Sequence, residues 1–380
     1  MKVLSLIVGL LPLAAVTGAH PADPEDIAAK RVLKLQDQYQ KNVLKTIKDR
    51  RTGCTPDKLL RRKEWGDLSK KDRLSYINAV YCLASKPGTT PHSQVPGART
   101  LFDDFVVSHI QQKPFVHADG LFLGYHRYFL HLYEKALREV CGYKGAQPYW
   151  DWTLNYEDPR NSTVLDGSPW SLGSNGVFVP NRDPIQLPLP GGGFVDFPPA
   201  TGGGCIASGP FTADKWQINL GPIGYAPQGP QGGLGYNPRC LTRDISLFWS
   251  NVTRPTAVAA LLDGAVDIAA FNAALDSVPN GVHGGGHFQL GTVQLDVFCS
   301  PSDPIFWLHH AQIDRLWAIW QGQALSSRTY PVAGTVTEFN VPPSENATLN
   351  TIVNFGVISP SKPLRKLVSQ IDEDLCVLYE

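Results

Sequence analysis

The chain has 380 residues, of which 43% are hydrophobic, and it carries 34 basic and 34 acidic side chains. This size permits a large buried core, in one large domain or in two. Because the charges balance, nothing in the composition favours a polyanionic partner, and we expect no nucleic-acid partner.

The N-terminus has the pattern of a secretory signal peptide. A basic start is followed by an apolar run, residues 4–16, and by small residues up to Ala19. The alternative is a buried first helix. The run is shorter than the about 20 residues that a membrane span needs, so we expect no membrane partner. The pattern predicts cleavage of residues 1–19, secretion, and a single mature domain over residues 20–380.

Two further features agree with an extracellular location. Glycosylation sequons begin at Asn161, Asn251 and Asn346. Seven cysteines are present, so at least one thiol is free or paired outside the chain. The cysteines form no Cys-X-X-Cys pair, which argues against a cysteine zinc site.

Apolar periodicity and turn residues predict a mainly helical chain. Residues 26–57 permit a helix, and a helical pattern that starts near Asp67 ends at Lys86-Pro87-Gly88. The further helices are expected at residues 101–111, 121–140, 243–247, 255–262, 266–275 and 306–320.

Two segments lack this periodicity. Residues 158–239 are crowded with glycine and proline, and we expect long ordered loops there, which in compact proteins are usually functional or disordered. Residues 329–380 are mixed and include strand-like stretches.

Eight of the ten histidines lie in two short stretches, residues 109–131 and 283–310. A lone histidine is more often an ordinary surface or core residue than a ligand. Two clusters beside apolar helices change those odds, because imidazole is the commonest protein ligand for a metal. The sequence therefore predicts a dinuclear metal site.

In the second stretch, His283 and His287 stand four residues apart and so share one face of a helix. Glycines 284–286 lie between them, although each costs a helix about 0.8–1.0 kcal/mol against alanine. We interpret these glycines as leaving the metal face open to a flat substrate. A third ligand is expected from the adjacent histidines 309–310, of which only one can face the same point.

In the first stretch, His126 opens a helical pattern, His117 precedes it across a turn, and His109 stands late on the helix before. His131 is five residues after His126, turned away from it, and is left out. Three imidazoles per metal, without thiolate or carboxylate, suit copper better than magnesium, calcium or manganese. Zinc also accepts three histidines, so a dinuclear hydrolase stays an alternative.

Four long motifs carry a resemblance to a known family. They are residues 103–109, 122–127, 148–152 and 303–317. With them, residues 54–380 resemble the tyrosinase, catechol oxidase and haemocyanin group of type-3 copper proteins, and most closely the short fungal tyrosinase-like enzymes.

The resemblance implies a mainly α fold, in which a four-helix bundle holds two copper ions, with long loops and a few short strands. It implies molecular oxygen as co-substrate and small phenols as substrates. The ligands that the family pattern assigns are His109, His117 and His126 for the first copper and His283, His287 and His310 for the second. His310 is selected because the ligand stands four residues before Asp314. No C-terminal lid domain is expected.

The chain departs from many relatives at three positions. Phe115 stands where relatives carry a cysteine that forms a thioether to the middle histidine of the first site. Gly284 replaces an asparagine that is common in relatives. Many relatives also carry a glutamate before the second site, which helps to hold a water. The nearest acid to that position in this chain is Asp276, whose side chain is shorter. Such a water deprotonates monophenols. We therefore expect oxidation of o-diphenols to o-quinones to exceed tyrosine hydroxylation, with Gly284 aiding substrate access.

Two alternatives are kept. The first is a tyrosinase that also hydroxylates monophenols. An oxygen carrier is less favoured, because carriers cover the site with a further domain.

Supporting roles follow for several residues. Asp314 is expected to orient a second-site imidazole through its other ring nitrogen, or else to pair with an arginine. Phe306 and Phe122 are expected to pack beside ligands, and Phe288 or Leu290 to restrict entry over the second copper.

The cysteines are expected to be structural. We favour a disulfide between Cys54 and Cys376 and another between Cys205 and Cys240. The pairing of the other three cysteines stays open.

Overall fold

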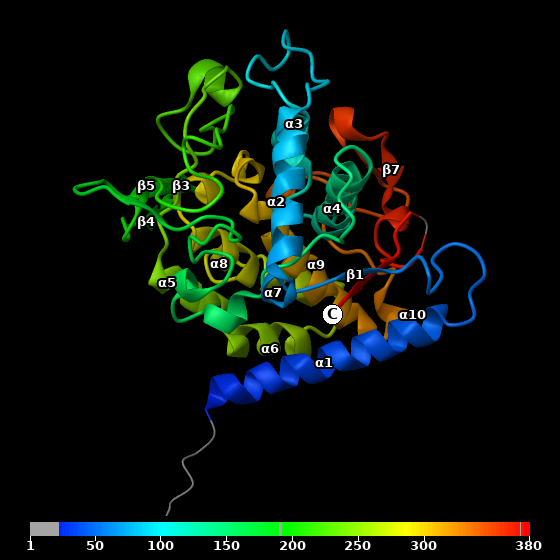
Figure 1. The fold of residues 1–380 in the computed structure, drawn as a ribbon. Helices are drawn as coiled ribbons and strands as arrows, with labels where there is room; N and C mark the ends of the chain where they lie inside the picture. Colours follow the sequence, from blue (N-terminus) through cyan, green and yellow to red (C-terminus); the bar gives the residue numbers. More distant parts are fainter. Residues whose placement is uncertain (1–22, 190–191, 373) are drawn as a thin grey trace, which may run out of the picture.

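The computed structural model describes residues 23–189, 192–372 and 374–380 (Figure 1). The expected signal peptide, residues 1–19, lies outside the described residues. The helices are α1 (Pro24–Ile47), α2 (Lys70–Ser85), α3 (Leu101–Gln112), α4 (Phe122–Glu139), α5 (Leu247–Ser250), α6 (Pro255–Gly264), α7 (Ile268–Leu275), α8 (Val282–Phe288), α9 (Ile305–Gly322) and α10 (Leu325–Arg328). The strands are β1 (Leu60–Arg62), β2 (Gly176–Phe178), β3 (Ile185–Pro188), β4 (Phe194–Phe197), β5 (Gly203–Ile206), β6 (Ile352–Val353), β7 (Lys362–Pro363) and β8 (Val377–Tyr379).

The core is built around α9, in which every residue from Ile305 to Gly322 is buried. A helix that is apolar or paired all round can lie in the centre of a large domain. It packs against α1, α4, α6 and α8. The mainly α fold expected from the sequence is confirmed.

Local signals start the helices that carry the first histidines. Thr100 and Asp103 form a reciprocal capping box at the start of α3, with the Thr100 hydroxyl 3.1 Å from Asp103 N and the Asp103 carboxylate 2.9 Å from Thr100 N. Asp119 accepts hydrogen bonds from the backbone N–H groups of Leu121 and Phe122, at 2.8 and 3.0 Å, and so caps α4.

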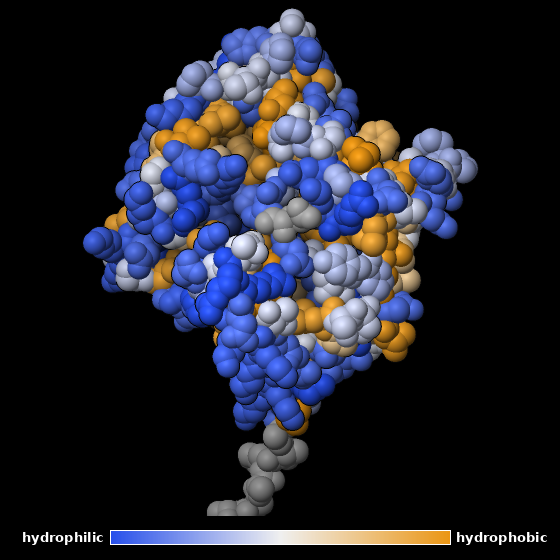
Figure 2. Space-filling model, turned by 90° about the vertical axis from the view of Figure 1, so that its right-hand side faces the viewer, coloured by the Kyte–Doolittle hydropathy of each residue, from blue (hydrophilic) through white to orange (hydrophobic). Residues whose placement is uncertain are grey.

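The long helix α1 runs along the base of the molecule in Figure 1 and packs against α6 and α9. Its buried positions, among them Val32, Leu35, Tyr39 and Val43, follow the three- and four-residue spacing of one helix face. Figure 2, which views the right-hand side of Figure 1, shows a mainly hydrophilic surface with hydrophobic residues in small groups.

The strands form small two-stranded sheets rather than a layer. The parallel pair β1–β8 brings the C-terminal segment beside the N-terminal part, with Leu60 opposite Val377. The antiparallel hairpin β3–β4 projects from one side of the molecule (Figure 1), with Ile185 opposite Phe197. Strands β2 to β5 lie within the segment that we expected to be loop.

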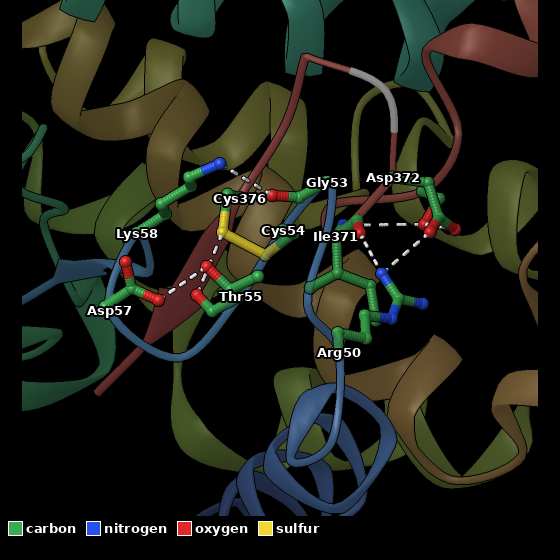
Figure 3. The surroundings of a disulfide bond; sticks show 10 residues. Arg50, Gly53, Cys54, Thr55, Asp57, Lys58, Ile371, Asp372 and Cys376 are labelled. Atoms are coloured by element: carbon green, nitrogen blue, oxygen red, sulfur yellow. Dashed lines mark hydrogen bonds and ion pairs between the residues drawn. A yellow bond between two sulfur atoms is a disulfide. The ribbon is translucent and has the colours of Figure 1, made fainter.

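Disulfides hold the long segments in place. Cys54 is bonded to Cys376, one of the two favoured pairs, and nearby Arg50 donates to the backbone oxygen of Ile371 and to Asp372, at 2.6 and 3.0 Å (Figure 3). A bridge that closes a loop of this length stabilises a fold by roughly 2–4 kcal/mol.

The second favoured pair, Cys205–Cys240, joins β5 to the segment that follows the glycine-rich stretch around residue 233. Cys82 of α2 pairs with Cys141 just after α4, and Cys299 is a free, buried thiol.

The prediction of a helix at residues 243–247 is wrong, because α5 begins only at Leu247. The Arg243 carbonyl accepts hydrogen bonds from the backbone of Gly176 and Gly203, at 3.2 and 2.8 Å. The buried Arg243 guanidinium pairs with Asp303 at 2.7 Å. Residues 243–246 are therefore extended, because their partners are distant in the chain. Among the described residues, no helix has the length and apolar character of a membrane span.

Candidate metal centre

Two groups of histidines meet in the middle of the helical core. The first cluster is His109, His117 and His126, and the second cluster is His283, His287, His309 and His310; in each, the ring nitrogens lie within 4.8 Å of one another. The rings of His126 and His310 are stacked with centroids 4.4 Å apart, so the clusters are adjacent. The geometry suits two neighbouring metal ions.

Different elements carry the first cluster. His109 lies on α3 and His126 lies on α4. His117 follows the short 3-10 helix Lys113–Phe115. Phe115 on this turn is 48% exposed. His131 stands apart from the cluster, beside Tyr128.

Hydrogen bonds fix the orientation of five of these rings. The Nδ1 atoms face acceptor oxygens at 2.7–3.2 Å: His109 with Phe298 O, His117 with Lys113 O, His126 with Phe122 O, His283 with Asp276 Oδ1 and His287 with Gln294 Oε1. Because these oxygens only accept, each neutral ring carries its hydrogen on Nδ1 and keeps the Nε2 lone pair free.

The free nitrogens fit a metal. The Nε2 atoms of His109, His126 and His283 are buried and have no hydrogen-bond partner among the described residues. A buried polar atom without a partner is costly, and a metal ion at the centre of each cluster would satisfy it.

Burial keeps five imidazoles of the two clusters neutral. It lowers the pKa of His109 to about 4. Burial first, and repulsion from neighbouring imidazoles second, lowers the pKa of His117, His126, His287 and His310 well below the usual value. At neutral pH the lone pairs are therefore available for a metal.

The adjacent histidines of α9 differ in their hydrogen bonds. The indole N–H of Trp152 donates to His309 Nδ1 at 3.1 Å. An indole N–H is a donor only, so the neutral His309 ring must carry its hydrogen on Nε2 and has no lone pair left. His310 Nε2 instead lies 3.2 Å from His287 Nε2, and both aim at one point. This arrangement favours His310 over His309.

The glycine run serves packing more than access. A Cβ on Gly286 would overlap the His309 ring, and one on Gly285 would lie 2.8 Å from Val252. Of these three glycines, Gly284 alone lines the cavity, and its Cβ would lie 2.8 Å from the Phe288 ring. The interpretation that all three glycines open the metal face is thus wrong for two of them.

Aromatic rings separate and support the clusters. The Phe122 centroid lies 4.6 Å from that of His126 and 4.7 Å from that of His283. The Phe306 centroid lies 4.2 Å from that of His310 and 5.2 Å from that of His109. Both therefore pack beside histidines of both clusters.

Asp314 does not orient an imidazole. Its carboxylate accepts hydrogen bonds from Arg127 and from the Tyr379 hydroxyl, both at 2.6 Å, which agrees with the alternative of an arginine pair. The carboxylate that meets a histidine is Asp276, with Oδ1 on His283 Nδ1 at 2.7 Å and Oδ2 on the backbone N–H of Ala118 at 3.2 Å.

A cavity of about 400 Å³ opens onto both clusters. Its lining includes His117, His283 and His287, together with Phe288. Leu290, the other residue expected to restrict entry, is fully buried in the core and is not part of the lining, so that expectation is wrong.

Several parts of the site had no local signal in the sequence. The carbonyls of Phe298 and Lys113 are backbone groups, and any residue type can supply them. Gln294 and Trp152 reach the histidines only through the folding of distant segments.

Comparisons with known proteins give the family. Residues 99–323 match the common central domain of tyrosinase. Over 329 residues the chain is 39% identical to Tyrosinase P from Aspergillus terreus, covering 84% of this chain and 91% of that protein. It is 38% identical over 353 residues to N-acetyl-6-hydroxytryptophan oxidase from Emericella nidulans, covering 86% and 94%.

A solved structure agrees with this match. The polyphenol oxidase of Thermothelomyces thermophila, in a variant with glycine replaced by asparagine, has a TM-score of 0.87 and 41% identity, covering 92% of this chain and 98% of that chain. The chain belongs to the tyrosinase family, the oxidases with a dinuclear copper centre that use molecular oxygen.

Proposed function

We propose that this protein is a catechol oxidase, which oxidises o-diphenols to o-quinones with molecular oxygen. The proposed ligands are His109, His117 and His126 for one copper and His283, His287 and His310 for the other. A bound copper pair would supply the redox chemistry, in which two diphenols give four electrons and four protons to one oxygen molecule and two waters form.

The chain supplies the shape of the site. The cavity reaches from solvent to His117, His283 and His287, and the Phe288 ring packs closely over Gly284, which has no Cβ to displace it. A flat phenol ring can therefore approach the Nε2 side of the histidines, while the buried rings of Phe122 and Phe306 behind them exclude water.

The preference for diphenols rests on the state of the cavity carboxylates. Asp276 already accepts from His283 and from the backbone of Ala118. Glu338 is bound by both oxygens to Lys113 Nζ, at 2.6 and 2.7 Å. A monophenol needs a positioned base before its ring can be attacked, and such help is worth typically 10²–10⁴-fold. Each oxygen of these two lining carboxylates already accepts one hydrogen bond, which weakens it as a base for that task.

The test compares substrates that differ by one hydroxyl. We expect 4-methylcatechol to be oxidised at least about 10²-fold faster than 4-methylphenol, measured as initial rates with a trace of diphenol to remove any lag. Protein stripped of copper serves as the blank. Equal rates on the two compounds would replace the proposal with the tyrosinase alternative, and oxygen uptake without quinone would favour a carrier.

We also propose that the protein is secreted and glycosylated. Three disulfides support an oxidising compartment. The sequon residues Asn161, Asn251 and Asn346 are all exposed, so an oligosaccharide transferase could reach them. Treatment of the secreted protein with a peptide N-glycosidase should lower its mass, and an unchanged mass would contradict the glycosylation.

A further inference from the structure

Much of the cavity lining is apolar. Part of it comes from the β3–β4 hairpin and part from later segments of the chain. The apolar lining residues include Leu187, Val195 and Phe197 from the hairpin, and Phe298, Phe339 and Val341 from the later segments. A substituent on a bound phenol ring would therefore contact hydrocarbon over most of its surface.

Two of the charges in this lining, Lys113 and Glu338, pair with each other. Apart from histidines, the charged residues among the described lining are Lys113, Asp276 and Glu338. The side chains of Lys113 and Glu338 are only 13% and 20% exposed. Lys113 Nζ also lies 4.9 Å from the centre of the Phe298 ring.

The loop that carries Glu338 is held against the first cluster. The backbone N–H of Phe339 donates to the carbonyl of Ala118, directly after His117, at 3.2 Å. Phe339 adopts φ 51°, a left-handed conformation that is uncommon for an aromatic residue and persists only where the surroundings impose it. The fold thus fixes Glu338 where it meets Lys113.

We propose that the Lys113–Glu338 ion pair sets the substrate class of this site, which is phenols with a neutral, apolar ring substituent. Each member of the pair cancels the other's charge, so neither a carboxylate nor an ammonium on the substrate finds a free counter-charge in this pair. The proposal rests on the proposed function and names the substituent that the site accepts.

Breaking the pair from either side should change the preference in opposite directions. Glu338→Gln leaves the Lys113 ammonium unpaired and should favour 3,4-dihydroxyphenylacetate, which carries a carboxylate. Lys113→Met leaves the Glu338 carboxylate unpaired and should favour dopamine, which carries an ammonium. We expect each kcat/KM ratio, charged catechol over 4-methylcatechol, to rise about three- to tenfold, the size of one partly screened charge contact.

The Lys113→Met variant keeps the backbone carbonyl that accepts from His117 Nδ1. A matched control is Asp263→Asn, which breaks the Arg31–Asp263 pair, also 2.6 Å long, on the outer helices α1 and α6. It should leave both ratios within twofold. The gains should also shrink somewhat in 0.5 M sodium chloride, because the cavity is open to solvent and salt screens partly buried charges, although less than exposed ones.

Binding under nitrogen separates this proposal from the proposed function. Calorimetry of the protein loaded with copper(I), which cannot accept electrons from a catechol, gives affinities for the three catechols without turnover, and the same opposite shifts should appear in Kd. Opposite shifts in the two variants support the charge rule even if no quinone forms in air, in which case the proposed function alone fails. Ratios and affinities that stay within twofold in both variants overturn the charge rule, whether or not 4-methylcatechol is oxidised.

Discussion

The two histidine clusters are oriented by different kinds of groups. In the first cluster, the Nδ1 partners are the backbone carbonyls of Lys113, Phe122 and Phe298. In the second cluster, two of the partners are the side chains of Asp276 and Gln294. The first site is therefore insensitive to the identity of its supporting residues, whereas the second depends on two particular side chains. Substitution of a supporting residue should therefore weaken metal binding more at the second site than at the first.

The largest effect should follow from removing a proposed ligand of the second site. His310→Ala should lower the copper content from about two ions per chain to about one and abolish diphenol oxidation. His309→Ala should retain both ions, because Trp152 takes up the His309 lone pair. Metal analysis after dialysis measures both variants, with circular dichroism as the control for folding. If His309→Ala lost copper and His310→Ala did not, His309 and not His310 would be the ligand.

A smaller effect should follow from removing a group that orients a ligand. Asp276→Ala should weaken copper at the second site by about 10–100-fold, the usual cost of losing such a partner. Phe298→Leu keeps the carbonyl that faces His109 and should change first-site affinity little. Competition with a chelator gives both affinities. An equal loss of copper affinity in the two variants would contradict the proposed difference between side-chain and backbone support of the two clusters.

The glycine run offers a third comparison within the second site. Gly286→Ala should reduce the free energy of unfolding of the copper-free protein by about 1–3 kcal/mol, because its Cβ would overlap the buried His309 ring. Gly264→Ala, near the end of α6, meets nothing within 4 Å and is the control. Denaturant unfolding measures both. A stable Gly286→Ala protein would show that His309 can move aside.

The smallest expected effect for a single residue is the pH dependence of the free energy of unfolding. Burial holds the pKa of His109 at about 4, below the unfolded value of about 6.5, so the unfolded chain binds more protons between these values. Stability of the copper-free protein should therefore fall as pH decreases from 7, by about 0.7 kcal/mol per such histidine between pH 7 and 6. The loss should level off below about pH 4 for His109. Thermal unfolding against pH tests this, and a flat profile would contradict it.

Sequence reasoning found the features that are encoded locally. The spacing of apolar residues located α2, α3, α4 and α9 to within a few residues, and the spacing of histidines located both clusters. These signals survive folding because a helix face is set by residues three and four apart.

Features that depend on partners distant in the chain were not predicted from the sequence. Residues 243–246 are extended because their backbone bonds lie elsewhere in the chain. The role of His309 requires Trp152, which stands 157 positions earlier, and the pairing of Cys82 with Cys141 requires the packing of α2 on α4. Asp314 looked like a ligand partner from its spacing, but its neighbours in space are Arg127 and Tyr379.

The position of Tyr379 has a consequence for biosynthesis. Its hydroxyl completes the buried contacts of Asp314 on α9, and Arg62 donates to the same hydroxyl at 2.7 Å. The central helix therefore gains its last buried partner only after residues 377–379 have left the ribosome, long after the histidines have been synthesised. Until then, the nascent chain holds its imidazoles on helices that are not yet locked together, so loading of the metals should follow the emergence of this segment from the ribosome.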